Sequence, residues 1–244
     1  PVCAPSRAAL SAGREYDEMR CCAFNGDGDF NATEHRTYYS LLADAGYWTM
    51  VAGKDDLTKP SILGHNKRAG AARERDGRYY QAELGFRDGA RCGGKGNTLF
   101  RYPAPVEPYG HFLARTAVTL ANGTAVSAFR AYHACLKAGQ LRAAKAARAR
   151  AEAALCTAET FPQELYQDTW VARRARALLA RRPAARPFFL WVSFPGPHEP
   201  FVVTAPMADA TASRAWPAAV ARPGHRERVA ACARAPGAPG VVAD

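Results

Sequence analysis

Residues 187–201 read Pro-Phe-Phe-Leu-Trp-Val-Ser-Phe-Pro-Gly-Pro-His-Glu-Pro-Phe. The run from Pro187 to Phe194 is apolar almost throughout, which predicts a central strand of a parallel sheet, covered on both faces. His198 follows between two prolines, at the edge of an α/β sheet where ligands bind. His198 is therefore a candidate site residue. A packed loop histidine is the alternative that this pattern leaves open.

A second short strand is predicted over residues 47–52, Tyr-Trp-Thr-Met-Val-Ala, because it is a short, largely apolar run. Lys54, Asp55 and Asp56 follow it at the same kind of sheet edge, so this charged group is a second site candidate. A solvated loop is the alternative interpretation.

The third informative stretch is residues 1–14, Pro-Val-Cys-Ala-Pro-Ser-Arg-Ala-Ala-Leu-Ser-Ala-Gly-Arg. Pro5 suits the first turn of a helix and Gly13 suits its end, so Cys3 is expected in a turn before a helix N-terminus. That end attracts anions, and Arg7 adds donors suited to an oxyanion. The pattern describes an anion site that contains a nucleophile, although a cysteine here can also be a small buried residue.

Taken together, three segments resemble the sulfatase family. They are Cys3-Ala4-Pro5-Ser6-Arg7 with Leu10, Gly13 and Arg14; Ala45-Gly46-Tyr47-x-Thr49-x-x-x-Gly53-Lys54; and residues 187–201. In that family a formylglycine-generating enzyme oxidises the cysteine to Cα-formylglycine. The resemblance implies that Cys3 acts as an aldehyde hydrate. One hydroxyl attacks sulfur; the other hydroxyl later loses its proton, and the covalent sulfate is eliminated as the aldehyde re-forms.

The resemblance also implies roles for other residues. Arg7, Lys54 and His198 converge on one sulfate, with Lys54 as a point charge and His198 as an electrostatic or general-acid group. Asp56 stands where many members have a histidine, so it is a substrate-binding candidate. His111, in a loop-rich region, is a further substrate-binding candidate, with ordinary packing as the alternative.

The family holds one divalent cation, usually Ca²⁺, with oxygen ligands. The main ligands are expected before Pro1 and after Asp244, so Cys3 in its modified form is the one metal-contacting residue expected in this sequence. The chain opens without Met and is interpreted as a fragment that is inactive by itself.

The fold that the resemblance implies is an α/β, alkaline-phosphatase-like sandwich, with a mostly parallel central sheet and helices on both faces, incomplete here. Residues 1–218 are predicted to form part of the catalytic domain, and residues 219–244 a low-complexity, poorly structured tail. Helices are predicted over 34–45, capped by Thr33, over 127–155, with a break at Gly139, and over 163–182, and a loop-rich region is predicted over 60–110.

The expected reaction is that of a sulfuric ester hydrolase, acting on a sulfated small molecule or sulfated polysaccharide. Two alternatives stay open: a phosphonate or phosphate monoester hydrolase of the same superfamily, and a truncated, inactive sulfatase-like protein. The net charge is +11; residues 1–60 hold nine acids and six Lys or Arg, so the rest carries about +14, largely as arginine in alanine-rich runs. No nucleic-acid-binding motif accompanies this charge, and no apolar run is long enough to span a membrane. We therefore expect neither a nucleic-acid partner nor a membrane span.

Seven cysteines are present, at positions 3, 21, 22, 92, 135, 156 and 232. If Cys3 is modified, the other six are able to pair in an oxidising compartment. Asn31-Ala32-Thr33 and Asn122-Gly123-Thr124 are glycosylation sequons, which predict a glycoprotein. Together these features favour the secretory pathway, with an extracellular or lysosome-like destination.

Overall fold

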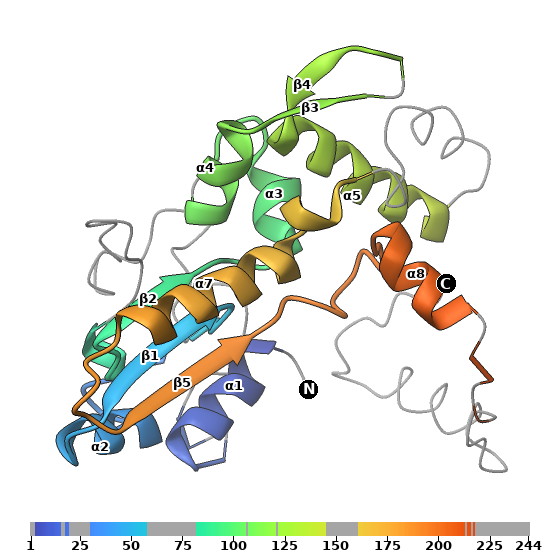
Figure 1. Ribbon diagram of the computed structural model, residues 1–244. Coiled ribbons are helices and arrows are strands. Elements are labelled where there is room, and N and C mark those ends of the chain that lie inside the picture. The colour runs from blue at the N-terminus through green and yellow to red at the C-terminus, as the bar shows by residue number, and fades with distance from the viewer. Residues whose placement is uncertain are drawn as a thin grey trace, which may run out of the picture. The chain divides into compact units, whose positions relative to one another are not determined.

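The computed structural model describes residues 3–15, 18–19, 30–57, 82–105, 107–120, 122–144, 161–212, 214–215 and 217. The chain forms two compact units, Pro1–Ala208 and Asp209–Asp244. The first unit contains a parallel sheet of β1 (Trp48–Gly53), β2 (Asp88–Arg91) and β5 (Phe188–Ser193), in the order β2-β1-β5 (Figure 1). All three strands therefore end at the same edge of the sheet.

Alternate residues of the strands enter two different apolar clusters. Met50 and Ala52 of β1 belong to one cluster, and Val51 between them belongs to the other, as the two-residue period of a strand requires. Each cluster is covered by helices. The first is covered by α3 (Lys95–Arg101), α4 (Pro108–Ala114), α5 (Ala128–Ala144) and α7 (Gln167–Arg181), and the second by α1 (Cys3–Ala12) and α2 (Tyr38–Asp44). The predicted α/β fold, with a parallel sheet and helices on both faces, is confirmed.

The position of β5 in the sheet differs from the prediction. Among the described strands β5 pairs only with β1, and Phe188 at its start is 43% exposed. The fully buried central strand is β1, where Met50, Val51 and Ala52 are inaccessible to solvent. An apolar run predicts a strand, but it does not distinguish a middle position from an edge position.

The prediction of a loop-rich region over 60–110 is wrong for most of residues 82–110. This region holds a short 3₁₀ helix (Ala82–Leu84), β2, α3 and the start of α4. β2 has the sequence Asp-Gly-Ala-Arg, with no apolar run, yet all four residues are buried. Its terminal charges are buried because each has an ionic partner: Asp88 with Arg181 and Arg91 with Asp55. Residues 58–81 lie outside the described part of the chain.

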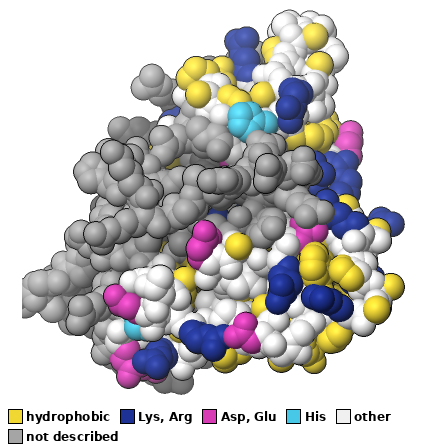
Figure 2. Space-filling view, turned by 90° about the vertical axis from the view of Figure 1, so that its left-hand side faces the viewer, with side chains coloured by type: hydrophobic (Ala, Val, Ile, Leu, Met, Phe, Trp, Pro, Cys, Tyr) yellow, Lys and Arg dark blue, Asp and Glu magenta, His cyan; other side chains and the backbone are white. Residues whose placement is uncertain are grey.

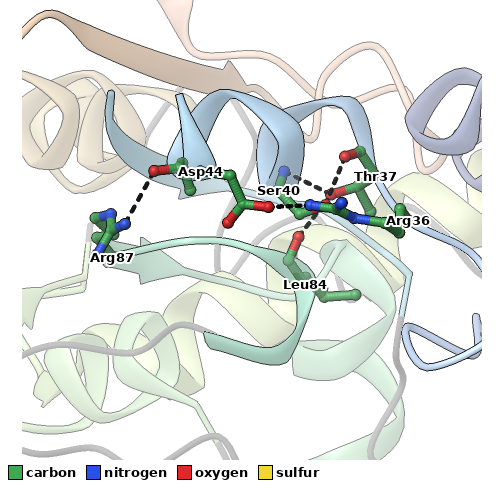
Figure 3. A network of polar contacts seen from close by, with 7 residues as sticks. Arg36, Thr37, Ser40, Asp44, Leu84 and Arg87 are labelled. Carbon is green, nitrogen blue, oxygen red and sulfur yellow. Dashed lines mark hydrogen bonds and ion pairs between the residues drawn. The ribbon is translucent and has the colours of Figure 1, made fainter. Parts of the chain in front are cut away.

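Two helix starts also differ from the predicted ones. α2 begins at Tyr38 because Thr37 is its N-cap: the Thr37 hydroxyl accepts a hydrogen bond from Ser40 N at 3.0 Å and donates one to Leu84 O at 2.7 Å (Figure 3). Thr33, the expected cap, instead hydrogen-bonds to the Asn31 side chain. The predicted helix over 163–182 is divided into a 3₁₀ turn (Gln163–Leu165) and α7.

α5 shows no break at Gly139 and continues to Ala144; residues 145–160 are outside the description. It follows a hairpin of β3 (Ala117–Thr119) and β4 (Ala125–Ser127). A last helix, α8, covers Ala205–Ala212. The predicted tail over 219–244 lies outside the described residues.

The cysteines do not all pair as expected. Cys92 is a free thiol, 5% exposed within the first apolar cluster, so it packs as a small apolar residue. Cys3 is also free, and Cys135 is disulfide-bonded. No helix among the described residues has the length and apolar character needed to cross a membrane. On the face drawn in Figure 2, the basic side chains of the described residues lie among acidic and apolar ones.

Candidate active site

Helix α1 is attached to the carboxyl ends of two strands through Arg7. Arg7 Nη1 donates to Lys54 O and to Ser193 Oγ, each at 2.8 Å. The Arg7 guanidinium carbon lies 5.9 Å from the centre of the Trp191 ring. Lys54 directly follows β1, and Ser193 is the last residue of β5. Cys3 and Arg7 are four residues apart and so lie on one face of α1. Cys3 is half-buried in the first turn of the helix, not in a turn before it as predicted.

Lys54 is a buried cation with a carboxylate partner. It is 5% exposed, and its Nζ lies 3.4 Å from Oδ2 of the buried Asp56. Asp56 has φ of 60°, in the left-handed region that non-glycine residues seldom adopt and that costs about 1–2 kcal/mol. Such a conformation is kept where the surrounding structure requires it, often at functional sites. Here it brings the carboxylate back toward Lys54.

Gly53 allows β1 and β5 to approach each other at this edge. Lys54 N donates to Ser193 O at 3.0 Å, and a Cβ at position 53 would collide with that carbonyl oxygen. The φ of +96° at Gly53 is also one that glycine readily adopts. The glycine is therefore required both by the turn and by the close approach that places Lys54 above the strand ends.

A second ion pair and helix α3 complete the same edge. Asp55, 1% exposed, pairs with Arg91 at the end of β2. A Cβ on Gly94, the N-cap of α3, would lie 3.3 Å from Lys54 Nζ. The next residue, Lys95, donates from Nζ to His198 O at 2.8 Å. The ends of β1, β2 and β5 and the His198 segment thus adjoin one another.

The His198 side chain is partly exposed and oriented by its neighbour. Its Nδ1 lies 2.7 Å from Glu199 O. A carbonyl accepts only, so this contact places a proton on Nδ1 and leaves Nε2 available to an incoming group. A proton on Nε2 is then present when the ring is positively charged.

Two charged groups near this segment have shifted pKa values. Burial lowers the pKa of the Lys95 ammonium below its usual value, and Asp168 partly offsets the effect. Burial raises the pKa of the Asp168 carboxyl, against the hydrogen bond from Gly196 and the charge of Lys95. In both residues removal from water is the dominant cause.

The predicted site residues are not all brought together. Arg7, Lys54 and Asp56 are joined by direct contacts, and His198 is linked to them through α3. His111 lies on α4, and no hydrogen bond among the described residues joins its side chain to the strand ends. His111 stays a prediction. Its neighbour Tyr109 is fully buried and donates to Leu165 O, so it is a packing residue.

Sequence reasoning did not identify four residues at this edge: Arg91, Lys95, Asp168 and Ser193. A weak signal existed for Ser193, as the polar end of an apolar strand, and for Lys95, in a Gly-Gly-Lys sequence that lacks the phosphate-loop spacing. Their partners are remote in sequence, so spacing alone does not reveal the contacts.

The described residues do not by themselves fit a cation site. Among them, no group of three or more His, Cys, Asp or Glu side chains gathers in a metal-binding arrangement. The carboxylates nearest to the strand ends have cationic partners: Asp55 pairs with Arg91 and Asp56 with Lys54. No metal-dependent step is therefore derived from these residues.

Comparison with known proteins places this arrangement in context. The sulfatase family model matches residues 1–222. Among solved structures, the chain is similar to the phosphonate monoester hydrolase SpPMH from Silicibacter pomeroyi, with 17% identity and a TM-score of 0.45. That similarity covers 94% of this chain and 39% of the hydrolase chain. No curated protein matches the chain.

Proposed function

Because the chain belongs to the sulfatase family, we propose that it is part of an enzyme that hydrolyses a sulfate ester to an alcohol and inorganic sulfate. The observation that supports this most directly is the attachment of α1 by Arg7 to Lys54 O and Ser193 Oγ. Cys3 lies about one turn before Arg7 on the same helix, which Arg7 joins to the carboxyl ends of β1 and β5, the edge where α/β sheets bind ligands.

The proposal includes conversion of Cys3 to Cα-formylglycine by a formylglycine-generating enzyme. When hydrated, this aldehyde supplies a hydroxyl nucleophile and later releases sulfate by re-forming its carbonyl group. The Cys3 thiol is free and half-buried at the first turn of α1, which suits a residue that must be modified and then meet a substrate.

The other residues act by charge, position and proton transfer. Lys54 stabilises the negative charge of the sulfate oxygens from a buried site, where an ion acts more strongly than in water. Asp56 is the counter-ion that fixes the Lys54 ammonium. His198 donates the proton that the leaving alkoxide oxygen takes when its bond to sulfur breaks.

Arg7 acts mainly as a positioning residue, because its Nη1 donates to two protein acceptors, Lys54 O and Ser193 Oγ. His111 remains a candidate substrate-binding residue. We also propose a divalent cation, Ca²⁺ by resemblance to the family. Cys3 in its modified form is the one described residue expected to touch it.

We propose a destination in the secretory pathway. The disulfide at Cys135 favours an oxidising compartment. Asn31 and Asn122, the acceptors of the two sequons, are both exposed. Removal of N-linked glycans from the protein secreted by eukaryotic cells should lower its apparent mass, and substitution of both asparagines should abolish that change.

The reaction is tested on the whole protein, co-expressed with the formylglycine-generating enzyme. Turnover of an aryl sulfate, an aryl phosphate and an aryl phosphonate monoester is compared, with Cys3→Ala as the control. The proposal predicts that the sulfate is the preferred substrate and that Cys3→Ala loses turnover by about 10⁴-fold or more, as removal of a covalent nucleophile does. Preference for the phosphonate or phosphate would instead support the alternative hydrolase of this superfamily.

A further inference from the structure

We propose that Lys95 and Asp168 are positioning residues that hold the segment Gly196–Val202 from two sides and thereby fix the place of His198. The inference rests on the proposed function only in the role that it gives to His198. Neither Lys95 nor Asp168 belongs to the three sequence segments that identify the family. Both are charged, and both are directed at the backbone of the same loop.

Lys95 uses its ammonium group as a three-way donor. It is 2% exposed, and its Nζ donates to His198 O at 2.8 Å, Pro200 O at 2.9 Å and Val202 O at 3.5 Å. An ammonium has three N–H donors, so three carbonyls are what one lysine is able to satisfy. Alternate carbonyls of the loop are therefore gathered around one buried atom.

Asp168 holds the beginning of the same segment. It lies in the first turn of α7, and its Oδ1 accepts a hydrogen bond from Gly196 N at 3.2 Å. A Cβ on Gly196 would be 2.5 Å from Asp168 Oδ2. Gly196 is thus required for the loop to come close enough to the carboxylate.

The two charges also act on each other. The charge of Asp168 favours the ammonium form of Lys95, and the charge of Lys95 favours the carboxylate form of Asp168. Removal from water disfavours both charged forms. A loop that needed only an ordinary anchor would be held by neutral donors, as Tyr166 holds Val202 O through its hydroxyl at 2.7 Å. Retention of two poorly hydrated charges indicates a loop whose position matters.

The consequence is a defined direction for the His198 ring. Lys95 holds the carbonyl of His198 itself, and His198 N donates to Pro195 O at 3.1 Å. The ring is then oriented by the contact between Nδ1 and Glu199 O. With the backbone held on both sides of the residue, Nε2 has little freedom to change its direction.

The test is amide hydrogen exchange at Gly196, His198 and Val202, with β1 amides as the internal reference for global unfolding. In Lys95→Met, exchange of these three amides is expected to become at least about tenfold faster while β1 is unchanged, because hydrogen bonds from a charged donor are stronger than neutral ones. Lys137→Met, the same substitution at an exposed lysine of α5, is the matched control and should have no effect. Unchanged exchange in Lys95→Met would overturn the proposal.

Asp168 provides a second pair of variants in case Lys95→Met does not fold. Asp168→Asn keeps an oxygen acceptor for Gly196 N, whereas Asp168→Ala removes it. The proposal expects faster exchange at Gly196 in Asp168→Ala and near-normal exchange in Asp168→Asn. Equal exchange at Gly196 in the two variants would contradict the proposal that Asp168 holds this segment, because a residue that only packs there would affect exchange equally in both variants.

A kinetic measurement separates this inference from the proposed function. In the whole enzyme, Asp168→Ala should reduce turnover of an alkyl sulfate more than turnover of a nitrophenyl sulfate, since a poor leaving group depends more on proton donation. Asp168→Asn should retain most of the alkyl sulfate turnover that Asp168→Ala loses. Faster exchange with equal loss of turnover on both sulfates would support the hold of Lys95 and Asp168 on the segment. It would contradict the role of His198 as the proton donor.

Discussion

At the amino ends of the strands, most polar side chains are exposed or satisfy nearby backbone groups, and the buried Asp88 of β2 pairs with a half-exposed Arg181. Arg36 pairs with Asp44, with the two side chains 57% and 68% exposed, and Arg87 donates to Ala43 O at 2.9 Å (Figure 3). At the carboxyl ends, Lys54, Asp55 and Asp56 are all buried. Each ion pair at the amino ends therefore has at least one partner in contact with water, whereas both partners of each pair at the carboxyl ends are buried.

The difference separates groups that support the fold from groups that serve a site. The contacts in Figure 3 cap α2 and join it to the 3₁₀ helix Ala82–Leu84 and to Arg87, so they are explained by the fold alone. Buried charges are costly, and replacing a buried ion pair with apolar residues is often neutral or stabilising. Their accumulation at the carboxyl ends is therefore better explained by chemistry at that edge than by stability.

The largest expected effect comes from breaking one buried pair at the carboxyl ends. Arg91→Met leaves Asp55 buried without its cation, which should lower the free energy of unfolding by about 3–5 kcal/mol. Urea denaturation measures the change. The double variant Arg91→Met with Asp55→Leu should recover much of the loss. An Arg91→Met variant as stable as the parent would show that the ion pairs at the carboxyl ends of the strands do not differ in energy from those at the amino ends.

The next effect concerns activity and not stability. Lys54→Met in the whole enzyme should reduce kcat by about 10²–10³-fold, the usual effect of removing one electrostatic stabiliser from an active site. Lys137→Met on the exposed face of α5 is the matched control, with kcat expected at the parent value. Full activity in Lys54→Met would show that the buried lysine only supports the fold.

A smaller effect is expected in the pH dependence of stability. Burial raises the pKa of Asp168 above its usual 3.8, so the folded protein holds this proton more tightly than the unfolded chain does. The stability contribution is therefore complete below pH 3.8 and is lost as the pH rises through the folded-state pKa.

The free energy of unfolding of the parent, minus that of Asp168→Asn, should accordingly decrease as the pH rises from 3.8 toward neutrality. Urea denaturation of both proteins across this range measures the difference, in which the titration of other groups cancels. A difference that increased with pH would show that the Gly196 hydrogen bond and the Lys95 charge lower the pKa of Asp168 by more than burial raises it.

The smallest effect belongs to the amino ends. Arg36→Ala removes an exposed ion pair and should change the free energy of unfolding by about 0–1 kcal/mol, with no effect on turnover. Thermal denaturation at low and high salt provides the measurement. A loss comparable with that of Arg91→Met would contradict the assignment of these charges to solvent.

Sequence alone identified the strands that carry apolar runs and the polar residues that follow them. β1, β5, Lys54 and His198 were recognisable because local pattern is enough to define a strand and the edge after it. β2 was not recognisable, because Asp88 and Arg91 are buried only through partners supplied by α7 and the loop after β1.

The same reason explains the missed residues of the site. Lys95 acquires its role from carbonyls about a hundred residues away in the chain, and Ser193 from Arg7 on α1. Contacts of this kind depend on the folded arrangement and have no local sequence pattern. The residues proposed to act on the substrate were therefore predicted from their type, whereas Lys95 and Ser193, which make these long-range contacts, were not.

The most direct test of the central claim is mass spectrometry of the peptide that contains Cys3, after co-expression with the formylglycine-generating enzyme. The account predicts an aldehyde in place of the thiol, trapped as a hydrazone by a hydrazine reagent and absent from the other cysteine peptides. A Cys3 peptide that keeps its thiol under conditions in which a known sulfatase is converted would contradict the claim.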